Sequence, residues 1–220
     1  MLIHNPNNSD GTATPSTKPP RRLVVAITGA SGAILGFRLL ELLKQLGGIE
    51  VHLVMSEAGR TTLLQETPHT YKEAKALADV VHEPSQIGAC LASGSFRHDG
   101  MLVLPCSIKT LSAVAHCYSA DLIARAADVC LKEGRPLLLA IRETPFHLGH
   151  LQMMEKVCSM GAIVYPPILG FYSGAKTIEQ SMDHLLGRML ARIGIENDFY
   201  EVWEGLRKGK TSSDVANIRL

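Results

Sequence analysis

The stretch that decides the fold is "VVAITGASGAILGFRLLELL", from Val24 to Leu43. An apolar run rich in β-branched residues ends in Thr28–Gly32, and a helical apolar pattern follows at once. This order predicts a buried strand over Leu23–Ile27, a tight turn, and a helix over Ala33–Leu46. Small residues let a ligand approach the backbone, and the free N–H groups at the start of the helix attract an anion.

The residues of this turn leave several interpretations open. Its sequence, Gly29-Ala30-Ser31-Gly32, is neither Walker A nor G-x-G-x-x-G, so an anion-binding role is only moderately specific. It also differs by one residue from G-x-S-x-G, the nucleophile elbow of hydrolases. No partner His or Asp is obvious for that role. A third interpretation is a turn that only permits tight packing.

Apolar runs and helical patterns alternate along the rest of the chain. Pro105 and Pro145 are expected to stop the third and fourth strands, and "YKEAKALADVV" is predicted to be helical at first. The alternation predicts an α/β fold, a parallel sheet covered by helices on both faces, in a single domain. Further strands are predicted over 51–55, 101–104, 137–141 and 162–165, and helices from residue 57 and over 107–116, 121–133, 148–160 and 177–193.

Composition limits the class of protein. The 220 residues carry a net charge of +1, which gives no strong field for nucleic acid, and no apolar run is long enough for a membrane span. Five cysteines without a C-x-x-C pair are typical of a reducing cytoplasm, not of a disulfide framework or a zinc site. We expect a disordered tail over 1–20, a folded domain over 21–205 and a polar tail over 206–220.

Ligands of parallel sheets bind beyond the carboxyl ends of the strands, so the residues that follow each strand are the candidates for a site. Ser56 follows the second strand, where a serine is usually a helix N-cap. The third strand is followed by Ser107, Ile108, Lys109 and Thr110, whose hydroxyls and amine suit a phosphate or a polar ring edge. Cys106, just before them, is a nucleophile or a buried thiol.

Arg142 and Glu143 follow the fourth strand. Side by side at a sheet edge they are costly unless paired or used, so they form an ion pair with Arg125 or Asp128, or they act as an anion-binding cation and a general acid. His147 and His150 have the spacing of two metal ligands, but no third ligand is evident. Hydroxyls, glycines, cations and one carboxylate together suit an anionic, phosphorylated aromatic cofactor.

Several motifs in fixed order resemble the flavin prenyltransferases, the UbiX-like family long labelled aromatic acid decarboxylases. They are "TGASGAILGFRLLELL", "ASGSF", "DGMLVLPCSIKTLSAVAH", "RAADVCLKEGRPLLLAIRETPFHLGHLQMM" and "GFY", and the resemblance runs from about Arg22 to Trp203. It implies a Rossmann-like, flavodoxin-like fold and a dodecamer with sites between subunits. It also implies transfer of a dimethylallyl group, without a metal, to N5 and C6 of reduced FMN.

The resemblance assigns roles residue by residue. Catalytic roles fall to Glu143, Ser31 and Lys132, with Glu143 in proton transfer and Ser31 near the reacting edge of the flavin. Glu66 matches a position near the site. FMN contacts fall to Gly29, Ala30, Ser31, Ser56, Ser107, Ile108, Lys109, Thr110 and Arg142, and substrate contacts to Tyr172, Arg188, Lys132, Ser93 and Gly94.

The resemblance also names the reaction partners. The donor is dimethylallyl monophosphate, and the product, prenylated FMN, serves a UbiD-like decarboxylase. Two other functions stay open at this stage: an FMN-dependent decarboxylase that acts directly on a small or aromatic acid, and a protein that only carries flavin. A flavin carrier has no need of the second phosphate site that Lys132 and Arg188 predict, because it performs no transfer.

Overall fold

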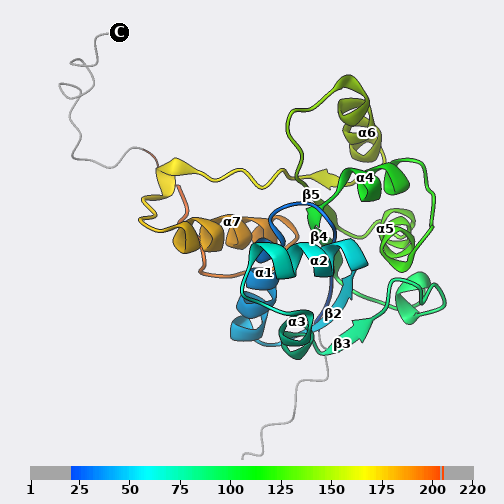
Figure 1. Cartoon of the computed structure of the whole chain (residues 1–220), viewed down its shortest axis with the longest axis horizontal. Helices are drawn as coiled ribbons and strands as arrows, with labels where there is room; N and C mark the ends of the chain where they lie inside the picture. Colours follow the sequence, from blue (N-terminus) through cyan, green and yellow to red (C-terminus); the bar gives the residue numbers. More distant parts are fainter. Residues whose placement is uncertain (1–20, 204, 206–220) are drawn as a thin grey trace, which may run out of the picture.

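A computed structural model describes residues 21–203 and 205, so the predicted tails, 1–20 and 206–220, lie outside the described residues. Parallel strands form one six-stranded sheet in the order β3-β2-β1-β4-β5-β6 (Figure 1). This is the Rossmann order; without the short edge strand β3, it is the flavodoxin order. The strands are β1 (Arg21–Ile27), β2 (Ile49–Met55), β3 (Val80–His82), β4 (Gly100–Cys106), β5 (Leu137–Ile141) and β6 (Ile163–Val164).

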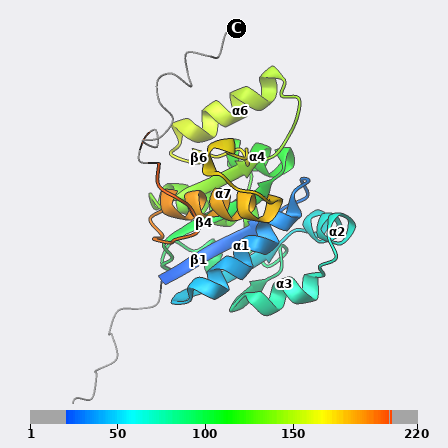
Figure 2. The same ribbon diagram turned by 90° about the vertical axis from the view of Figure 1, so that its left-hand side faces the viewer.

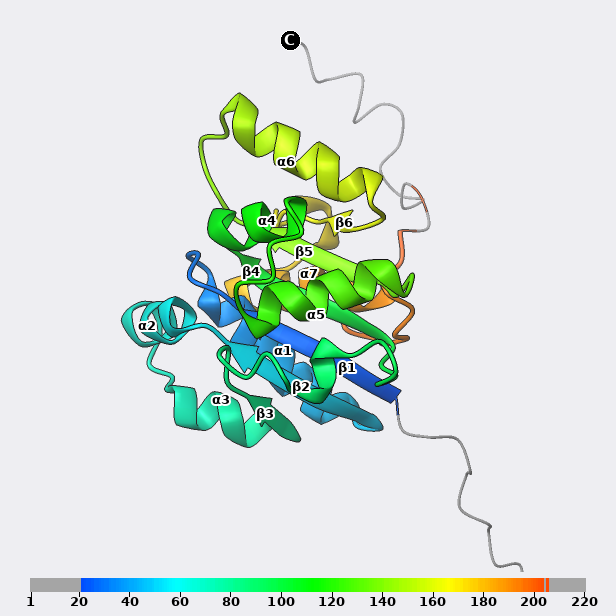
Figure 3. The same cartoon turned by 90° about the vertical axis from the view of Figure 1, so that its right-hand side faces the viewer.

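Helices cover both faces of the sheet, which confirms the predicted α/β architecture. Figure 2 shows α1, α3 and α7 in front of one face, and Figure 3 shows α4, α5 and α6 in front of the other. The helices are α1 (Ala33–Leu46), α2 (Glu57–Glu66), α3 (Tyr71–Leu77), α4 (Ile108–Ala115), α5 (Leu122–Lys132), α6 (Leu148–Ser159) and α7 (Ile178–Arg192), with short 3₁₀ turns η1 (Cys90–Ala92) and η2 (Phe171–Ser173).

The apolar character of the strands follows from this double cover. Along β1, Leu23, Val25 and Ile27 join the core beneath α1 and α7, whereas Val24 and Ala26 join the core beneath α4 and α5. Because both sides of the strand are buried, alternation between apolar and polar residues is absent. The sequence therefore shows an unbroken apolar run where a half-exposed strand would show every second residue polar.

Helix α1 lies close to the sheet and is tied to α7. A Cβ atom on Gly36 would lie 2.4 Å from the carbonyl oxygen of Leu104, so only glycine allows this approach. Arg38 of α1 binds both carboxylate oxygens of Asp183 on α7, at 2.7 and 2.9 Å. Among the described residues, no helix combines the length and apolar content needed to cross a membrane.

Two details of the sheet differ from the expectations. Strand β3 was not predicted, because its three residues stand inside a segment with a helical pattern at its start. Strand β4 continues through Pro105 to Cys106 instead of stopping at the proline. The pairing of β4 with β5 shifts register between Val103 and Cys106. Pro105 has no backbone N–H to donate to a neighbouring strand, so the register shifts where the proline interrupts the hydrogen bonds between β4 and β5.

Candidate functional site

Thr28 joins the carboxyl ends of β1 and β4. Its hydroxyl donates to the carbonyl of Pro105 at 2.7 Å and accepts from the backbone N–H of Ser107 at 2.8 Å. The N–H of Ser56 donates to the carbonyl of Ile27 at 3.0 Å, which brings the end of β2 to the same place. The residues after these three strands therefore meet at one edge of the sheet, as the sequence predicts.

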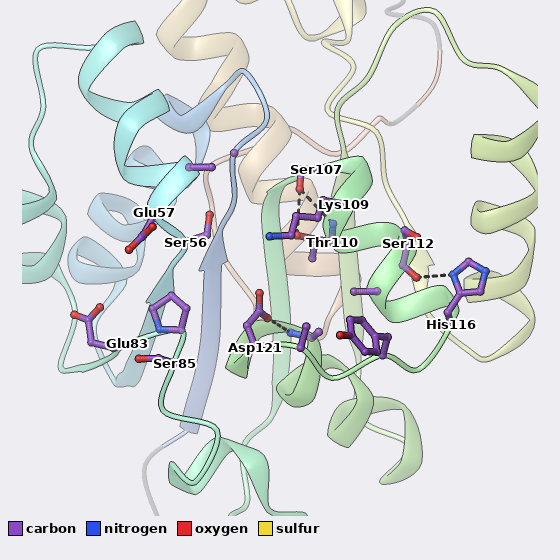
Figure 4. A pocket seen from close by; sticks show the side chains of 17 residues that line it. Ser56, Glu57, Glu83, Ser85, Ser107, Lys109, Thr110, Ser112, His116 and Asp121 are labelled. Atoms are coloured by element: carbon purple, nitrogen blue, oxygen red, sulfur yellow. Dashed lines mark hydrogen bonds between the residues drawn. The ribbon is translucent and has the colours of Figure 1, made fainter.

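A cavity of about 900 Å³ opens beyond these strand ends (Figure 4). Its volume lies within the range usual for cofactor sites, roughly 300–1,000 Å³. Ala30, Ser31, Ile108 and Arg142 do not line it. The predicted FMN-binding residues that do line it are Gly29, Ser56, Ser107, Lys109 and Thr110.

Three helix N-termini face this cavity. Ser56 caps α2 by accepting from the N–H of Gly59 at 3.0 Å, and Ser107 caps α4 by accepting from the N–H of Thr110 at 3.3 Å. Asp121 caps α5 in the same way. The N-cap interpretation of Ser56 is therefore confirmed, and the Ser56 hydroxyl still has a hydrogen to donate to a ligand. The Ser107 hydroxyl also shares a hydrogen bond of 3.1 Å with the hydroxyl of Thr110. Converging N-termini favour a phosphate at this edge.

Part of the cavity lining was not predicted. Figure 4 shows Glu83 and Ser85 on one side, and Ser112 of α4 and the C-cap residue His116 on the other. Ser112 and His116 are four residues apart on one helix and share a hydrogen bond of 2.8 Å between the ring and the Ser112 carbonyl. Helical spacing from Lys109, three residues before Ser112, was the signal that would have placed Ser112 on this face. Glu83 directly follows β3, and no spacing pattern in the sequence marked it as part of a site.

Glu66, at the end of α2, holds the small-residue turn. Its carboxylate accepts from the N–H of Gly32 at 2.8 Å and of Ala33 at 3.3 Å, and it also bonds the Ser31 side chain. Burial opposes ionisation, but these hydrogen bonds and the charge of Arg142 together lower the pKa of the Glu66 carboxyl. Glu66 therefore links the turn to the end of β5.

This geometry decides between the interpretations of the turn. The Ser31 hydroxyl pairs with a carboxylate rather than with an imidazole, so it lacks the base of a hydrolase elbow. Gly29 packs tightly, since a Cβ there would lie 2.3 Å from the Cβ of Ala58. The contact with Ala58 therefore requires glycine at position 29. The other side of the turn faces the cavity, which Gly29 also lines.

The end of β5 places Arg142 and Glu143 together. The Arg142 N–H donates to the carbonyl of Cys106 at 3.2 Å, and the Glu143 carboxylate accepts from the N–H of Thr144 at 2.8 Å. Arg125 pairs with Asp128 at 2.8 Å. The expected ion pair with Arg125 or Asp128 is thus wrong, because those two residues satisfy each other.

Lys132, Ser93 and Gly94 lie at the other end of the sheet. Helix α5 begins at the cavity and runs about 15 Å to Lys132, at 1.5 Å per residue, where β5 is about to begin. Lys132 pairs there with Glu133, beside Gly94. The Ser93 and Ser95 hydroxyls bond each other at 2.9 Å. Within one chain the structure does not bring Lys132 to Glu143.

Tyr172 of η2 and Arg188 of α7 belong to a separate aromatic cluster around His184. The Tyr172 ring packs edge-on against His184 and Trp203, with centroids 5.7 and 5.8 Å apart. Arg188 lies over the ring of Tyr200, which also contacts His184. Figure 1 shows the segment around η2 extended past α7, away from α4 and α5. The residues predicted to hold the donor phosphate thus form two groups on opposite sides of the chain.

Two further chemical alternatives can be judged from burial and contacts. Cys106 is fully buried, and burial raises the pKa of its thiol to about 12, which excludes a thiolate nucleophile at neutral pH. The His147 ring accepts from the N–H of Gly149 and caps α6, and it packs on His150 at 3.5 Å between ring centroids. His147 is therefore the N-cap of α6, and His150 packs against its ring.

Comparison with known proteins agrees with this geometry. A family profile described as Flavoprotein matches residues 12–188. Flavin prenyltransferase UbiX of Escherichia coli K12 is 48% identical over 187 residues, which cover 84% of this chain and 99% of that protein. Flavin prenyltransferase PAD1, mitochondrial, of Saccharomyces cerevisiae is 43% identical over 94% of this chain and 85% of its own length.

Solved structures give the same result. AnUbiX (PadA1), crystallised with FMN and dimethylallyl pyrophosphate, superposes with a TM-score of 0.83 at 45% identity, over 86% of this chain and all of that one. A dodecameric FMN-dependent UbiX-like decarboxylase of Escherichia coli O157:H7 gives 0.81 at 43% identity, over 84% and 100%.

The fold and the cavity thus define a flavoprotein of the flavodoxin-like α/β class. Within that class the chain belongs to the UbiX flavin prenyltransferase family, on the extent and identity of these matches. The resemblance found from the motifs is confirmed.

Proposed function

We propose that this protein is a flavin prenyltransferase. It transfers the dimethylallyl group of dimethylallyl monophosphate to N5 and C6 of reduced FMN and releases prenylated FMN and phosphate. The observation that carries the proposal is the cavity of about 900 Å³ at the carboxyl edge of the sheet, lined by Ser56, Ser107, Lys109 and Thr110, in a chain of this family. Reduced FMN supplies the electron-rich atoms that take up the prenyl group.

The residues around the cavity have the chemistry to hold FMN. The N-termini of α2 and α4 and the Lys109 amine favour the flavin phosphate, and the hydroxyls of Ser56 and Ser107 donate to its polar edges. Glu66 connects two further parts of the proposed FMN site, because it bonds the 29–32 turn and interacts with the charge of Arg142. FMN contacts by Gly29, Ala30, Ser31, Ile108 and Arg142 complete the proposed set.

The donor site is proposed to form between subunits. Breaking the allylic C–O bond builds negative charge on the leaving phosphate, and Lys132, Arg142, Arg188 and the Tyr172 hydroxyl stabilise that charge. In one chain, Lys132 ends α5 at the end remote from the cavity, and Tyr172 and Arg188 belong to the aromatic cluster around His184, so the proposal has neighbouring copies supply them. This separation supports a homo-oligomer, and a structural relative is a dodecamer. Ser93 and Gly94 are carried by the same edge as Lys132.

Glu143 is proposed to move a proton during the transfer, either at flavin N5 or on the leaving phosphate. Its carboxylate accepts a hydrogen bond from the backbone N–H of its neighbour Thr144, which fixes the direction of the side chain. Ser31 is proposed to orient the reacting edge of the flavin, and Glu66 orients Ser31.

The product's destination and the enzyme's location remain proposals. Prenylated FMN is proposed to pass to a UbiD-like decarboxylase, because it is a cofactor made for another enzyme. A cytoplasmic location is proposed from the scattered free cysteines. The yeast relative is named mitochondrial, so fractionation of cells that produce the tagged chain has two named outcomes.

The transferase is tested by anaerobic incubation with reduced FMN and dimethylallyl monophosphate, followed by mass spectrometry of the released flavin. The expected product is heavier than FMN by one five-carbon unit. Unmodified FMN, with flavin bound to the protein, would contradict the proposal. Release of CO₂ from an aromatic acid with FMN alone would favour the direct decarboxylase instead. A parallel incubation with the pyrophosphate tells which donor is used.

A further inference from the structure

Three potential metal ligands converge where β2, β3 and η1 meet. Nδ1 of His52 lies 2.9 Å from Nε2 of His82, and one ring nitrogen of each histidine and the Sγ of Cys90 all lie within 4.8 Å of one another. The two imidazoles are buried, whereas Cys90 is exposed, so the cluster opens to solvent on the thiol side. None of the three residues lines the flavin cavity, and the transfer reaction has no use for them.

A carboxylate prepares the inner histidine for metal binding. Nε2 of His52 lies 2.8 Å from Oε1 of Glu50, and the Arg22 guanidinium holds the same oxygen at 2.9 Å. A carboxylate at Nε2 keeps the proton on that nitrogen and leaves the lone pair of Nδ1 free to point at the cluster. This carboxylate–histidine arrangement is the usual support of a metal-binding imidazole.

A ring contact also supports this role. The rings of Phe96 and His52 pack in an edge-to-face arrangement, with centroids 5.2 Å apart, and this contact restricts rotation of the imidazole.

We propose that His52, His82 and Cys90 bind one divalent transition-metal ion of the zinc type, with the fourth position open to water. Two imidazole nitrogens and one thiolate are a donor set that zinc accepts in tetrahedral geometry. On binding, the thiol of Cys90 loses its proton to solvent. The Nε2 proton of His82, which otherwise bridges the two rings, moves to Nδ1. The nitrogens then separate to about 3.3 Å, as metal–nitrogen bonds of about 2.0–2.1 Å require.

The position of the cluster gives the ion a structural role. Cys90 opens η1, and η1 is followed directly by Ser93 and Gly94. An ion shared by Cys90, His52 of β2 and His82 of β3 would hold this loop against the two strands. The ion therefore orders a loop of the proposed donor site and takes no part in the transfer itself.

The proposal is tested by titrating the full-length oligomer, freed of metal, with Co²⁺ as a spectroscopic probe of zinc sites. We expect one Co²⁺ per chain with a near-ultraviolet thiolate-to-cobalt band, and displacement of Co²⁺ by Zn²⁺. Cys90→Ser should abolish the band and weaken Zn²⁺ binding by tenfold or more. Cys158→Ser is the matched control, because Cys158 is also exposed but lies on α6, and it should leave both unchanged.

A second measurement needs no variant. Zn²⁺ should slow the alkylation of Cys90 in the unmodified protein but leave that of Cys117 and Cys158 unchanged, as read by peptide mass spectrometry. Sub-stoichiometric Co²⁺ binding, a spectrum without a thiolate band, or a Cys90→Ser spectrum equal to that of the parent would overturn the proposal. Each readout is independent of prenyl transfer, so it stands apart from the proposed function.

Discussion

The carboxylate of Glu66 lies 2.8 Å from the backbone nitrogen of Gly32, 34 residues earlier in the chain. Gly32 is the N-cap of α1 and has a φ of 99°, a left-handed conformation that suits glycine, but it has no side chain with which to cap the helix. Glu66 therefore supplies from α2 the hydrogen-bond acceptor that a capping residue would provide locally. The shape of the turn depends on this distant residue.

Replacing Glu66 with alanine should destabilise the turn and the start of α1. The N–H groups of Gly32 and Ala33 lose their acceptor, and loss of a cap costs about 1 kcal/mol. For a chain of this size that corresponds to a fall of about 2–4 °C in the thermal unfolding midpoint. Differential scanning fluorimetry measures it. Gln65→Ala, at the exposed neighbouring position, should leave the midpoint unchanged; an equal fall there would contradict the capping role.

Gly29→Ala should disturb the contact between the turn and α2. The new Cβ would lie 2.3 Å from the Cβ of Ala58, and overpacking of this kind costs roughly 1–3 kcal/mol. We expect lower stability and weaker FMN binding, measured by flavin fluorescence quenching. The double variant Gly29→Ala/Ala58→Gly removes the closest contact and leaves only backbone atoms of residue 58, at 3.2 and 3.3 Å, so it should recover most of the binding. Gly88→Ala, where a Cβ meets nothing within 4 Å, is the control.

The fold was largely predictable because its signals are local. Unbroken apolar strands and capped helices identify themselves in sequence, and the parallel sheet places Ser56, Ser107 and Arg142 at one edge. Strand β3 was missed because three residues are too few to show a period and gain their order from pairing with β2. The donor site could not be located on one chain, because Lys132 and Glu143 lie at opposite ends of the strands. Glu143 follows the carboxyl end of β5, whereas Lys132 precedes its amino end.

Glu143→Gln should retain FMN but lose transfer. The glutamine side-chain oxygen can still accept from the N–H of Thr144, so the local structure is kept while the ability to exchange a proton is lost. General acid–base groups contribute about 10²–10⁴-fold, and we expect a loss of turnover in that range. Product is measured by mass spectrometry, with FMN and the donor at concentrations above their dissociation constants. Glu155→Gln on α6 is the control, and undiminished turnover by Glu143→Gln would remove the proposed proton role.

The pH dependence of stability should reflect buried histidines. Burial, and then the charge of Arg135, lower the pKa of His98 from its ordinary value of 6.5. Because the folded chain takes up this proton less readily than the unfolded chain, the stabilisation is complete above about pH 6.5 and is lost as the pH falls toward the folded pKa. The thermal unfolding midpoint of the parent protein should therefore fall as the pH is lowered below about 6.5. In His98→Gln, the midpoint should depend less steeply on pH. The exposed His116→Gln should keep the parent slope; an unchanged slope in His98→Gln would refute the assignment.

Mixed oligomers provide the most direct test of a site shared between subunits. Lys132→Ala and Glu143→Gln should each be inactive alone, because every site lacks one group. When the two are co-expressed with different tags and purified together, some sites receive Glu143 from one chain and Lys132 from its neighbour. Random assembly should restore about one quarter of the parent turnover, since both chains of a site must be of the required kind. Arg142→Ala mixed with Glu143→Gln is the matched control: both residues follow β5 of the same chain, so no mixture rebuilds the site. Recovery no greater than the sum of the separate variants would place Lys132 outside the site, whereas recovery in both mixtures would show that Arg142 is dispensable rather than that the site is shared.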